Sequence, residues 1–152
     1  MHPHLSTASE ALSWLQANDI RRVELVFADL TSVARGKVMS TASFAETLGA
    51  KMPSLFLGLT VTGGEPPQVF KRIFPPMFPD MAMRPDWSTL VVDPLAGVPS
   101  ATVICDIEAR FTAADGHCQY EVAELSPRQL LKRVLARLKA AGYTAKVAPE
   151  LE

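Results

Sequence analysis

Two glutamates, Glu150 and Glu152, close the sequence with one leucine between them. In a β-strand, residues two positions apart project to the same face, so this spacing places two carboxylates side by side. Paired carboxylate oxygens suit Mg²⁺ or Mn²⁺ as ligands. By composition alone the same pair is typical of a solvated polar terminus, so a metal role needs support from the rest of the chain.

Other residue types that carry chemistry lack the spacing of a known site. The glycines form neither of the phosphate-binding patterns GxGxxG and GxxxxGK[ST]. His2 and His4 lie near the N-terminus and His117 lies beside a turn signal, where exposed bystanders are expected rather than a zinc site. Cys105 lies in an apolar run and is expected to be a buried small hydrophobic residue. We therefore assign no catalytic residue and no nucleophile within this chain.

The composition is that of one globular domain. The chain has 152 residues, of which 48% are hydrophobic, enough to bury a core. Fifteen Lys and Arg against sixteen Asp and Glu leave a net charge of -1, which argues against nucleic acid or a membrane surface as partner. The sequence shows no transmembrane segment, no secretory signal and only two cysteines, so we expect a reduced, cytoplasmic protein.

The clearest predicted element is a helix near the C-terminal end. Ser126 at the N-cap, Pro127 at the first helical position and Gly142 past the end mark its limits. One apolar stripe at helical spacing supplies its packing surface: Leu130, Leu131, Val134, Leu135 and Leu138. The basic residues on the remaining surface are interpreted as a solvated face. Residues 143–147 have strand propensity and run into Glu150 and Glu152.

Shorter elements fill the first half. Thr7 and Glu10 predict a capping box and a short helix, and Ser40 or Thr41 can cap a second helix closed by Gly49. Between the helices we expect a hairpin, and further strands after them. The expected strands are Arg22 to Ala28, Val33 to Met39, Pro53 to Thr62, Thr89 to Val92 and Ala101 to Ile107.

Two loops stand out. Gln68 to Pro85 has no sustained period, which makes it the first place to look for a site, and Asp115-Gly116 is a turn signal. The order of elements predicts an α+β fold with a mixed sheet and helices packed on one face.

Several separated pieces carry a family resemblance. They are Val33-Ala34-Arg35-Gly36-Lys37, Pro79-Asp80, Arg84-Pro85-Asp86-Trp87, Ser126-Pro127-Arg128 and Pro149-Glu150-Leu151-Glu152. In this order they resemble the amino-terminal portion of the glutamine synthetase superfamily, over residues 9–152.

The resemblance implies a domain organisation. It divides the chain into an N-terminal helical segment (1–20), a β-grasp-like domain (21–125), and a helix and strand (126–152) that lead into an absent catalytic domain. That strand would be the first of the catalytic domain, and Glu150 and Glu152 would each bind one of two divalent metals. The competing interpretation is a stand-alone β-grasp module that binds a protein partner without catalysis.

The implied reaction is ATP-dependent activation of the glutamate γ-carboxylate, followed by attack of ammonia or an amine, in a ring-shaped homo-oligomer with Mg²⁺ or Mn²⁺. The isolated fragment is expected to be inactive and to bind no cofactor tightly. In such rings a loop of this domain borders the neighbouring subunit's active site, and here it falls within Leu57 to Pro67. Its candidate acceptor-amine residues are Gly58, Thr60, Thr62, Gly63 and Gly64.

This loop departs from the family pattern. Glutamine synthetases carry an aspartate there that helps to bind ammonium, whereas this sequence has no acidic residue in the loop before Glu65. The departure favours an organic amine or polyamine over ammonium as the acceptor.

Overall fold

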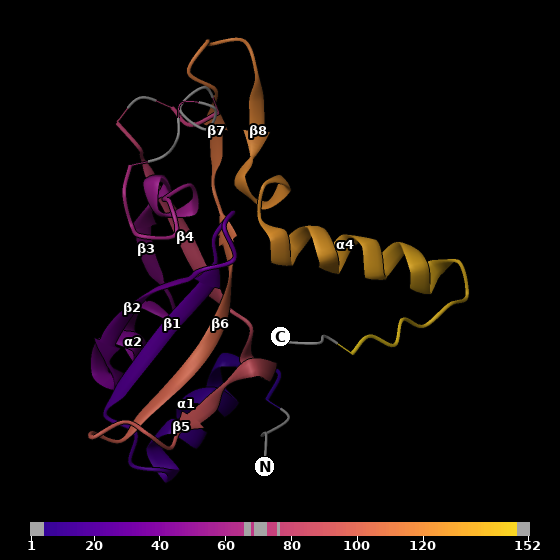
Figure 1. Ribbon diagram of the computed structural model, residues 1–152. Coiled ribbons are helices and arrows are strands. Elements are labelled where there is room, and N and C mark those ends of the chain that lie inside the picture. Colours follow the sequence, from indigo (N-terminus) through magenta and orange to yellow (C-terminus); the bar gives the residue numbers. More distant parts are fainter. Residues whose placement is uncertain (1–4, 66–67, 69–72, 76, 149–152) are drawn as a thin grey trace.

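Strand β1 (Arg22–Ala28) follows directly from its alternating sequence. Val23, Leu25 and Phe27 are buried, and the residues between them are partly exposed. The computed structural model, which describes residues 5–65, 68, 73–75 and 77–148, places this strand inside a larger sheet (Figure 1). The predicted hairpin is confirmed, because β1 pairs with β2 (Ala34–Ser40) in antiparallel register along its whole length.

The sheet is mixed, as predicted. Its strands run in the order β2-β1-β6-β4-β3, and β5 pairs with β6. β1 and β6 are parallel, whereas the other pairs are antiparallel. The remaining strands are β3 (Ala50–Pro53), β4 (Asp80–Pro85), β5 (Val91–Asp93) and β6 (Ser100–Glu108).

The first helix, α1 (Ala8–Ala17), begins with the predicted capping box. The Thr7 hydroxyl accepts from the Glu10 amide at 3.2 Å, and the Glu10 carboxylate accepts from the Thr7 amide at 3.0 Å. Ala11 and Leu15 are fully buried and belong to the same core as the sheet. The sequence signal therefore both starts the helix and orients its apolar side.

The second helix, α2 (Thr41–Thr47), is capped by Ser40, one of the two predicted residues. The residue in the left-handed conformation at its end is Leu48, with φ 51°, and not the predicted Gly49. Gly49 is required for a different reason, since a Cβ there would lie 2.5 Å from the carbonyl oxygen of Met83. Phe44 of α2 is fully buried and makes an edge-to-face contact with Trp87.

One core joins the inner face of the sheet to these two helices. Its largest fully buried side chains come from the sheet, the two helices and the segments that connect them: Leu15, Leu25, Phe44, Leu57, Phe74, Met81, Met83, Leu90 and Ile107. The α+β fold with a mixed sheet is thus confirmed. None of the described helices is both long and apolar enough to cross a membrane.

The strand predicted from Pro53 to Thr62 is wrong. Strand β3 ends at Pro53, and a 3₁₀ helix, η1 (Ser54–Leu57), follows it. A short apolar run fits a buried strand and a buried helical turn equally well, so its sequence pattern could not decide. The irregular stretch predicted from Gln68 to Pro85 is also partly wrong, because its last six residues form β4.

A second, two-stranded sheet surrounds the turn signal at Asp115-Gly116. It pairs β7 (Arg110–Thr112) with β8 (Gln119–Glu121), and Gly116 adopts φ 76° in the turn between them. The 3₁₀ helices η2 (Trp87–Thr89) and η3 (Val122–Glu124) complete the connections.

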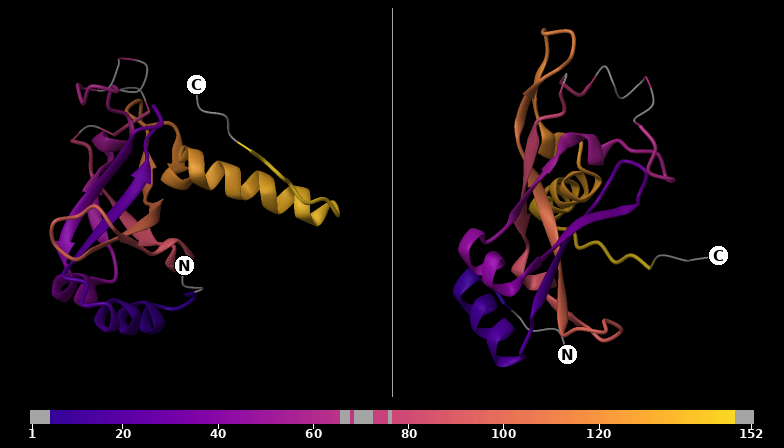
Figure 2. Two further views of the ribbon diagram at one scale, coloured as in Figure 1. Left: turned by 60° about the horizontal axis from the view of Figure 1, so that its bottom comes forward. Right: turned by 90° about the vertical axis from the view of Figure 1, so that its left-hand side faces the viewer.

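The final helix, α4 (Pro127–Ala140), confirms its sequence signals. Ser126 is the N-cap, Pro127 opens the helix, and Gly142 past its end has φ 85°. Figure 1 and the left view of Figure 2 show α4 extending away from the sheet, and none of its residues is buried. Residues 143–148 are exposed and form no strand, so the predicted strand is wrong over this range. Strand propensity alone is insufficient when no neighbouring strand pairs with the segment.

Candidate functional site

The turn between β1 and β2 is built on a buried carboxylate, Asp29. Its Oδ1 accepts hydrogen bonds from the Thr31 amide at 2.8 Å, the Thr31 hydroxyl at 2.8 Å and the Val33 amide at 2.9 Å. The side chain has no exposed surface. A short acidic side chain that binds the backbone two and four residues later is a typical device for closing a turn.

The second oxygen of Asp29 binds Arg35. Arg35 Nε donates to Asp29 Oδ2 at 2.8 Å, and Arg35 Nη2 donates to the carbonyl oxygen of Thr60 at 2.8 Å. Only 15% of the Arg35 side chain is exposed. The guanidinium therefore connects the β1–β2 turn to a loop 25 residues further along the chain.

The ionisation of Asp29 follows from these contacts. Burial alone raises the pKa of Asp29, but the hydrogen bonds from Arg35, Val33 and Thr31 outweigh it and hold the pKa below its ordinary value. Asp29 is therefore charged at neutral pH and forms a buried ion pair with Arg35.

The next two residues of the same sequence piece also have structural roles. A Cβ on Gly36 would lie 2.2 Å from the carbonyl oxygen of Leu25, so only glycine fits β2 against β1 there. Lys37 Nζ donates to the carbonyl oxygen of Lys51 at 3.2 Å, which connects the edge strands β2 and β3. The contacts of Arg35, Gly36 and Lys37 thus give this sequence piece a structural role in the described chain, and none of the three contacts indicates a catalytic role.

The loop of residues 57–65, predicted to face an amine, contains a defined turn. The Thr60 carbonyl accepts from the Gly63 amide at 2.9 Å, and the Thr60 hydroxyl accepts from the Gly64 amide at 2.8 Å. The hydroxyls of Thr60 and Thr62 lie 3.3 Å apart. The structure brings these four candidate residues together, whereas Gly58 is buried at the foot of the loop, directly after η1.

The tip of this loop is exposed, and its residues 61–64 are uncharged. Residues 61–65 are all exposed, and Gly63 adopts φ 82° with no atom near the position of a Cβ. Between Leu57 and Gly64 the side chains are apolar or hydroxylated. Residues 60–64 can therefore contact a ligand through backbone groups, two hydroxyls and apolar surface, and the first carboxylate after them is that of the exposed Glu65.

The proposed metal ligands, Glu150 and Glu152, lie outside the described residues, as do His2 and His4. Within the described ranges, no three His, Cys, Asp or Glu side chains gather as metal ligands would. His117 is exposed, as expected.

Cys105 is buried, as the sequence predicts. Burial raises the pKa of its thiol to about 12, with nearby Asp106 adding to the shift. Such a thiol stays protonated at neutral pH and is a poor nucleophile. The structure therefore agrees with its assignment as a core residue.

A charged cluster attaches the first two turns of α4 to the sheet. Arg128 binds Asp86 through Nη2 and Asp106 through Nε, the latter at 3.2 Å, and Lys132 Nζ lies 2.6 Å from Asp106. Burial raises the pKa of Asp86, but the Ser88 hydrogen bond and the charges of Arg128 and Lys132 hold it below its ordinary value. Two separate pieces of the family resemblance thus meet in this cluster. The sequence analysis missed both this contact and the Asp29 pair.

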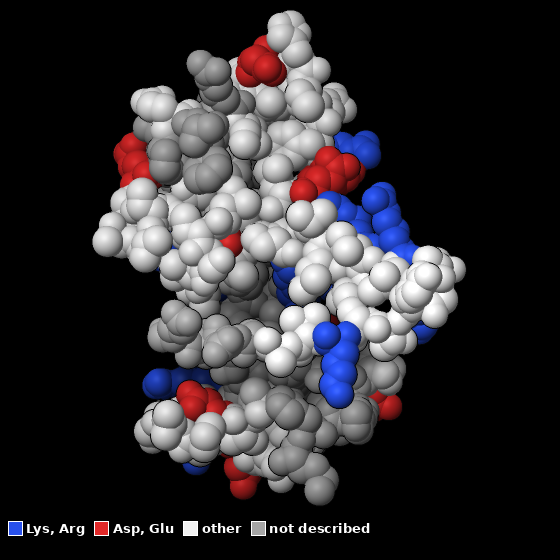
Figure 3. Space-filling model, turned by 45° about the vertical axis from the view of Figure 1, so that its right-hand side comes forward, with Lys and Arg blue, Asp and Glu red and all other residues white. Residues whose placement is uncertain are grey.

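The apolar stripe of α4 faces solvent in this chain. The exposed fractions are 50% for Leu130, 57% for Leu131, 52% for Val134 and 39% for Leu135. Figure 3 turns this side of the molecule forward and shows uncharged surface beside Lys and Arg side chains. Side chains of this kind at helical spacing normally pack against another apolar surface.

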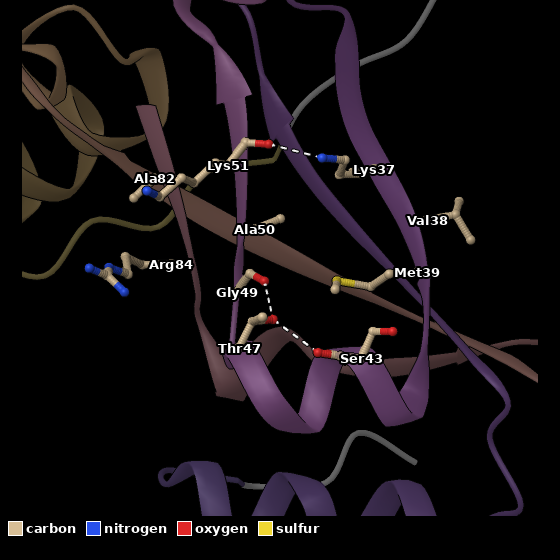
Figure 4. Close-up of a pocket in the computed structure, with 10 residues that line it drawn as sticks. All are labelled: Lys37, Val38, Met39, Ser43, Thr47, Gly49, Ala50, Lys51, Ala82 and Arg84. Carbon is tan, nitrogen blue, oxygen red and sulfur yellow. Dashed lines mark hydrogen bonds between the residues drawn. The ribbon is translucent and has the colours of Figure 1, made fainter. Parts of the chain in front are cut away.

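A cavity of about 490 Å³ lies between the edge strands β2 and β3 and helix α2. Figure 4 shows that several of its polar groups bind one another: the Thr47 hydroxyl lies within hydrogen-bond distance of the carbonyl oxygens of Ser43 and Gly49, and Lys37 donates to the Lys51 carbonyl. None of the predicted site residues lines it. We assign no chemistry to this cavity.

Sequence comparison finds similar enzymes, although no family model matches. A glutamate–isopropylamine ligase of a Pseudomonas species is 28% identical over 142 residues, which are 91% of this chain and 29% of the relative. A glutamine synthetase of Methylococcus capsulatus is 31% identical over 151 residues, which are 96% of this chain and 28% of the relative. The chain thus spans less than a third of the length of these curated relatives.

Solved structures with a similar fold carry the name GmaS. The GmaS–ADP complex matches with a TM-score of 0.60 and 20% identity, over 93% of this chain and 26% of GmaS. GmaS without ligand matches with a TM-score of 0.59 and 21% identity, over 86% of this chain. The relatives and the similar fold together support the resemblance of this chain to the amino-terminal domain of the glutamine synthetase superfamily.

Proposed function

We propose that this chain is the amino-terminal domain of a longer ATP-dependent ligase that joins the γ-carboxylate of glutamate to an amine. In the proposed reaction ATP phosphorylates the γ-carboxylate and leaves as ADP. The amine nitrogen then attacks the acyl carbon, and phosphate and a proton leave. The curated relatives support this class of reaction through their names, a glutamate–isopropylamine ligase and a glutamine synthetase.

The observation that carries the proposal is the uncovered apolar stripe of α4. Four of its side chains are between 39% and 57% exposed on a helix that extends from the domain. In water such a surface favours burial by about 25 cal/mol per Å² of apolar area. We propose that the remainder of the ligase covers it. In the alternative, a stand-alone interaction module, the stripe would bind a separate protein.

The acceptor is proposed to be an organic amine. Ammonium is strongly hydrated, so a site that binds it must replace its water with close oxygen ligands, preferably charged ones. The turn of residues 60–64 offers hydroxyls and backbone groups instead. An alkyl amine can compensate with its hydrocarbon part, which gains about 0.8 kcal/mol per buried CH₂.

The turn of residues 60–64 is proposed to border the acceptor site of a neighbouring subunit in a ring-shaped homo-oligomer. Its exposed tip and its anchored base suit such a role. Glu150 and Glu152 are proposed to hold Mg²⁺ or Mn²⁺, which would neutralise phosphate charge. Glu150→Ala and Glu152→Ala should each abolish turnover of the complete ligase while far-ultraviolet circular dichroism stays unchanged.

The test is the acceptor preference of the complete ligase. We expect a higher kcat/KM for isopropylamine or a polyamine than for ammonium. Thr60→Asp should shift the ratio toward ammonium, because the new carboxylate can still accept from the Gly64 amide. Thr112→Asp adds the same charge on β7 and serves as the matched control. A preference for ammonium over every amine would contradict the proposed acceptor, and no γ-glutamyl product from any amine or ammonium would contradict the ligase itself.

A further inference from the structure

The bonds that close the turn between β1 and β2 do not involve Arg35. Three hydrogen bonds to Asp29 Oδ1, from the Thr31 amide, the Thr31 hydroxyl and the Val33 amide, already close the turn between β1 and β2. Arg35 binds the other oxygen, Oδ2, and extends a second nitrogen to a different part of the chain. A buried charge with two well-made bonds to two separate segments connects those segments.

Two bonds join the loop of residues 57–65 to the β1–β2 turn. At the foot of the loop the Leu30 amide donates to the Leu57 carbonyl at 2.9 Å. In the turn of residues 60–64, Arg35 Nη2 donates to the Thr60 carbonyl, which also accepts from the Gly63 amide. Because the Thr60 carbonyl accepts from both Arg35 and Gly63, it fixes the turn of residues 60–64 relative to the sheet.

The charge balance suits a loop that faces an amine. A lone guanidinium near an amine-binding turn would repel a protonated amine. Asp29 lies 2.8 Å from Arg35 and neutralises its charge. The pair can therefore hold the Thr60 carbonyl in place without adding net positive charge to the loop.

We propose that Arg35 is a positioning residue for the acceptor amine: held by Asp29, it fixes the turn of residues 60–64 in the shape that contacts the substrate. This inference rests on the proposed function for the identity of the substrate, and on the structure for the connection itself. An arginine suits this role because Nε and Nη2 are separate nitrogens that reach two acceptors in different segments, whereas a lysine carries all its donors on a single atom at the end of a flexible chain and does not reproduce this geometry.

The first experiment tests the connection in the 152-residue chain without any enzyme assay. Amide hydrogen exchange of Gly63 and Gly64, followed by NMR, should become roughly 10-fold faster or more in Arg35→Gln, as expected for loss of a charge-assisted hydrogen bond. Arg35→Lys should accelerate it as well. Amides of α1 and α2 should keep their protection, which shows that the variant is folded. Arg110→Gln, in the exposed Arg110–Glu121 pair, is the matched control and should change neither.

The second experiment uses the complete ligase. Arg35→Gln should raise the KM for the amine by about 10-fold, the effect of one lost charge-assisted bond, and leave the KM values for ATP and glutamate within about twofold. Arg35→Lys should not restore the amine KM. A merely structural role would be rescued by lysine, because lysine restores the ion pair with Asp29.

The outcomes separate the two hypotheses. Unchanged exchange of Gly63 and Gly64 in Arg35→Gln, or an equal rise of all three KM values, would overturn the positioning role of Arg35. A wild-type ligase that forms no γ-glutamyl product would overturn the proposed function and the substrate named for this loop. Even then, faster exchange would show that Arg35 holds the turn.

Discussion

The β1–β2 turn and helix α4 are both attached to the rest of the domain by ion pairs, but the pair at the turn is buried and those at α4 are partly exposed. The turn buries its ion pair, with the Asp29 side chain fully inaccessible, and its bonds are completed within the described chain. Helix α4 is attached by partly exposed charges in its first two turns, and its apolar stripe remains uncovered. The comparison indicates that the contacts of the turn are complete within this domain, whereas the apolar stripe of α4 is available to pack against the remainder of the proposed ligase.

Of the changes to these two attachments, Asp29→Ala should have the largest effect on stability. The variant leaves the Arg35 charge and two backbone amides without their acceptor, so the free energy of unfolding should fall by about 3 to 5 kcal/mol. Urea denaturation of the 152-residue chain measures this. Asp115→Ala, which removes an exposed turn bond to the His117 amide, is the control and should cost less than about 1 kcal/mol. Equal losses in the two variants would show that the buried pair contributes no more to the free energy of unfolding than an exposed turn hydrogen bond.

Low pH should also reduce the contribution of the Asp29–Arg35 pair to the free energy of unfolding. Because the folded pKa of Asp29 is lowered, its contribution to stability is present above the unfolded pKa and is lost as pH falls through the folded value. The stability difference between the wild type and Asp29→Asn should therefore be constant near neutral pH and shrink below about pH 4, the ordinary range of an aspartate. Urea denaturation at a series of pH values measures this difference. If this stability difference instead grew on acidification, the pKa of Asp29 in the folded state could not be lowered, and the assigned direction would be wrong.

Arg128→Ala should have an intermediate effect. It removes the links from α4 to Asp86 and Asp106, which are only partly buried, so we expect a loss of about 1 kcal/mol. High salt should reduce the difference between the variant and the wild type. A loss as large as that of Asp29→Ala would mean that the two attachments are energetically alike, and the comparison would fail.

Leu131→Ala should have the smallest effect in the isolated chain. The side chain is 57% exposed, so the free energy of unfolding should change by no more than about 0.5 kcal/mol. Leu25→Ala, at a fully buried position, should cost about 2 to 5 kcal/mol by the same chemical change. A comparable loss at Leu131 would show that the stripe is already packed.

Sequence reasoning located the elements whose signals are local. The capping residues Thr7 and Ser126 and the alternation in β1 identified two helices and the hairpin, because caps and side-chain period depend on neighbours in the chain. It failed between Pro53 and Leu57, where an apolar run suits more than one conformation. It also failed after Gly142, where strand propensity has no partner strand among the described residues.

The site was predicted less completely than the fold. The role of the loop with Thr60 and Gly63 rests on the resemblance and stays a prediction, and the absence of an acidic residue before Glu65 was visible in the sequence. The bond from Arg35 to Thr60 was missed, because a contact across 25 residues leaves no local pattern. The Asp-x-Thr spacing at Asp29 was the available signal for the buried turn, although it did not reveal which cation would bind it.

The central claim, that this domain works only as part of a γ-glutamyl amine ligase, is tested most directly by mass spectrometry of the reaction products. The complete protein, supplied with ATP, Mg²⁺, glutamate and isopropylamine, should form γ-glutamyl isopropylamide, and the 152-residue chain under the same conditions should form none. Product from the isolated chain, or no γ-glutamyl product from the complete protein with any amine or ammonium, would contradict the claim.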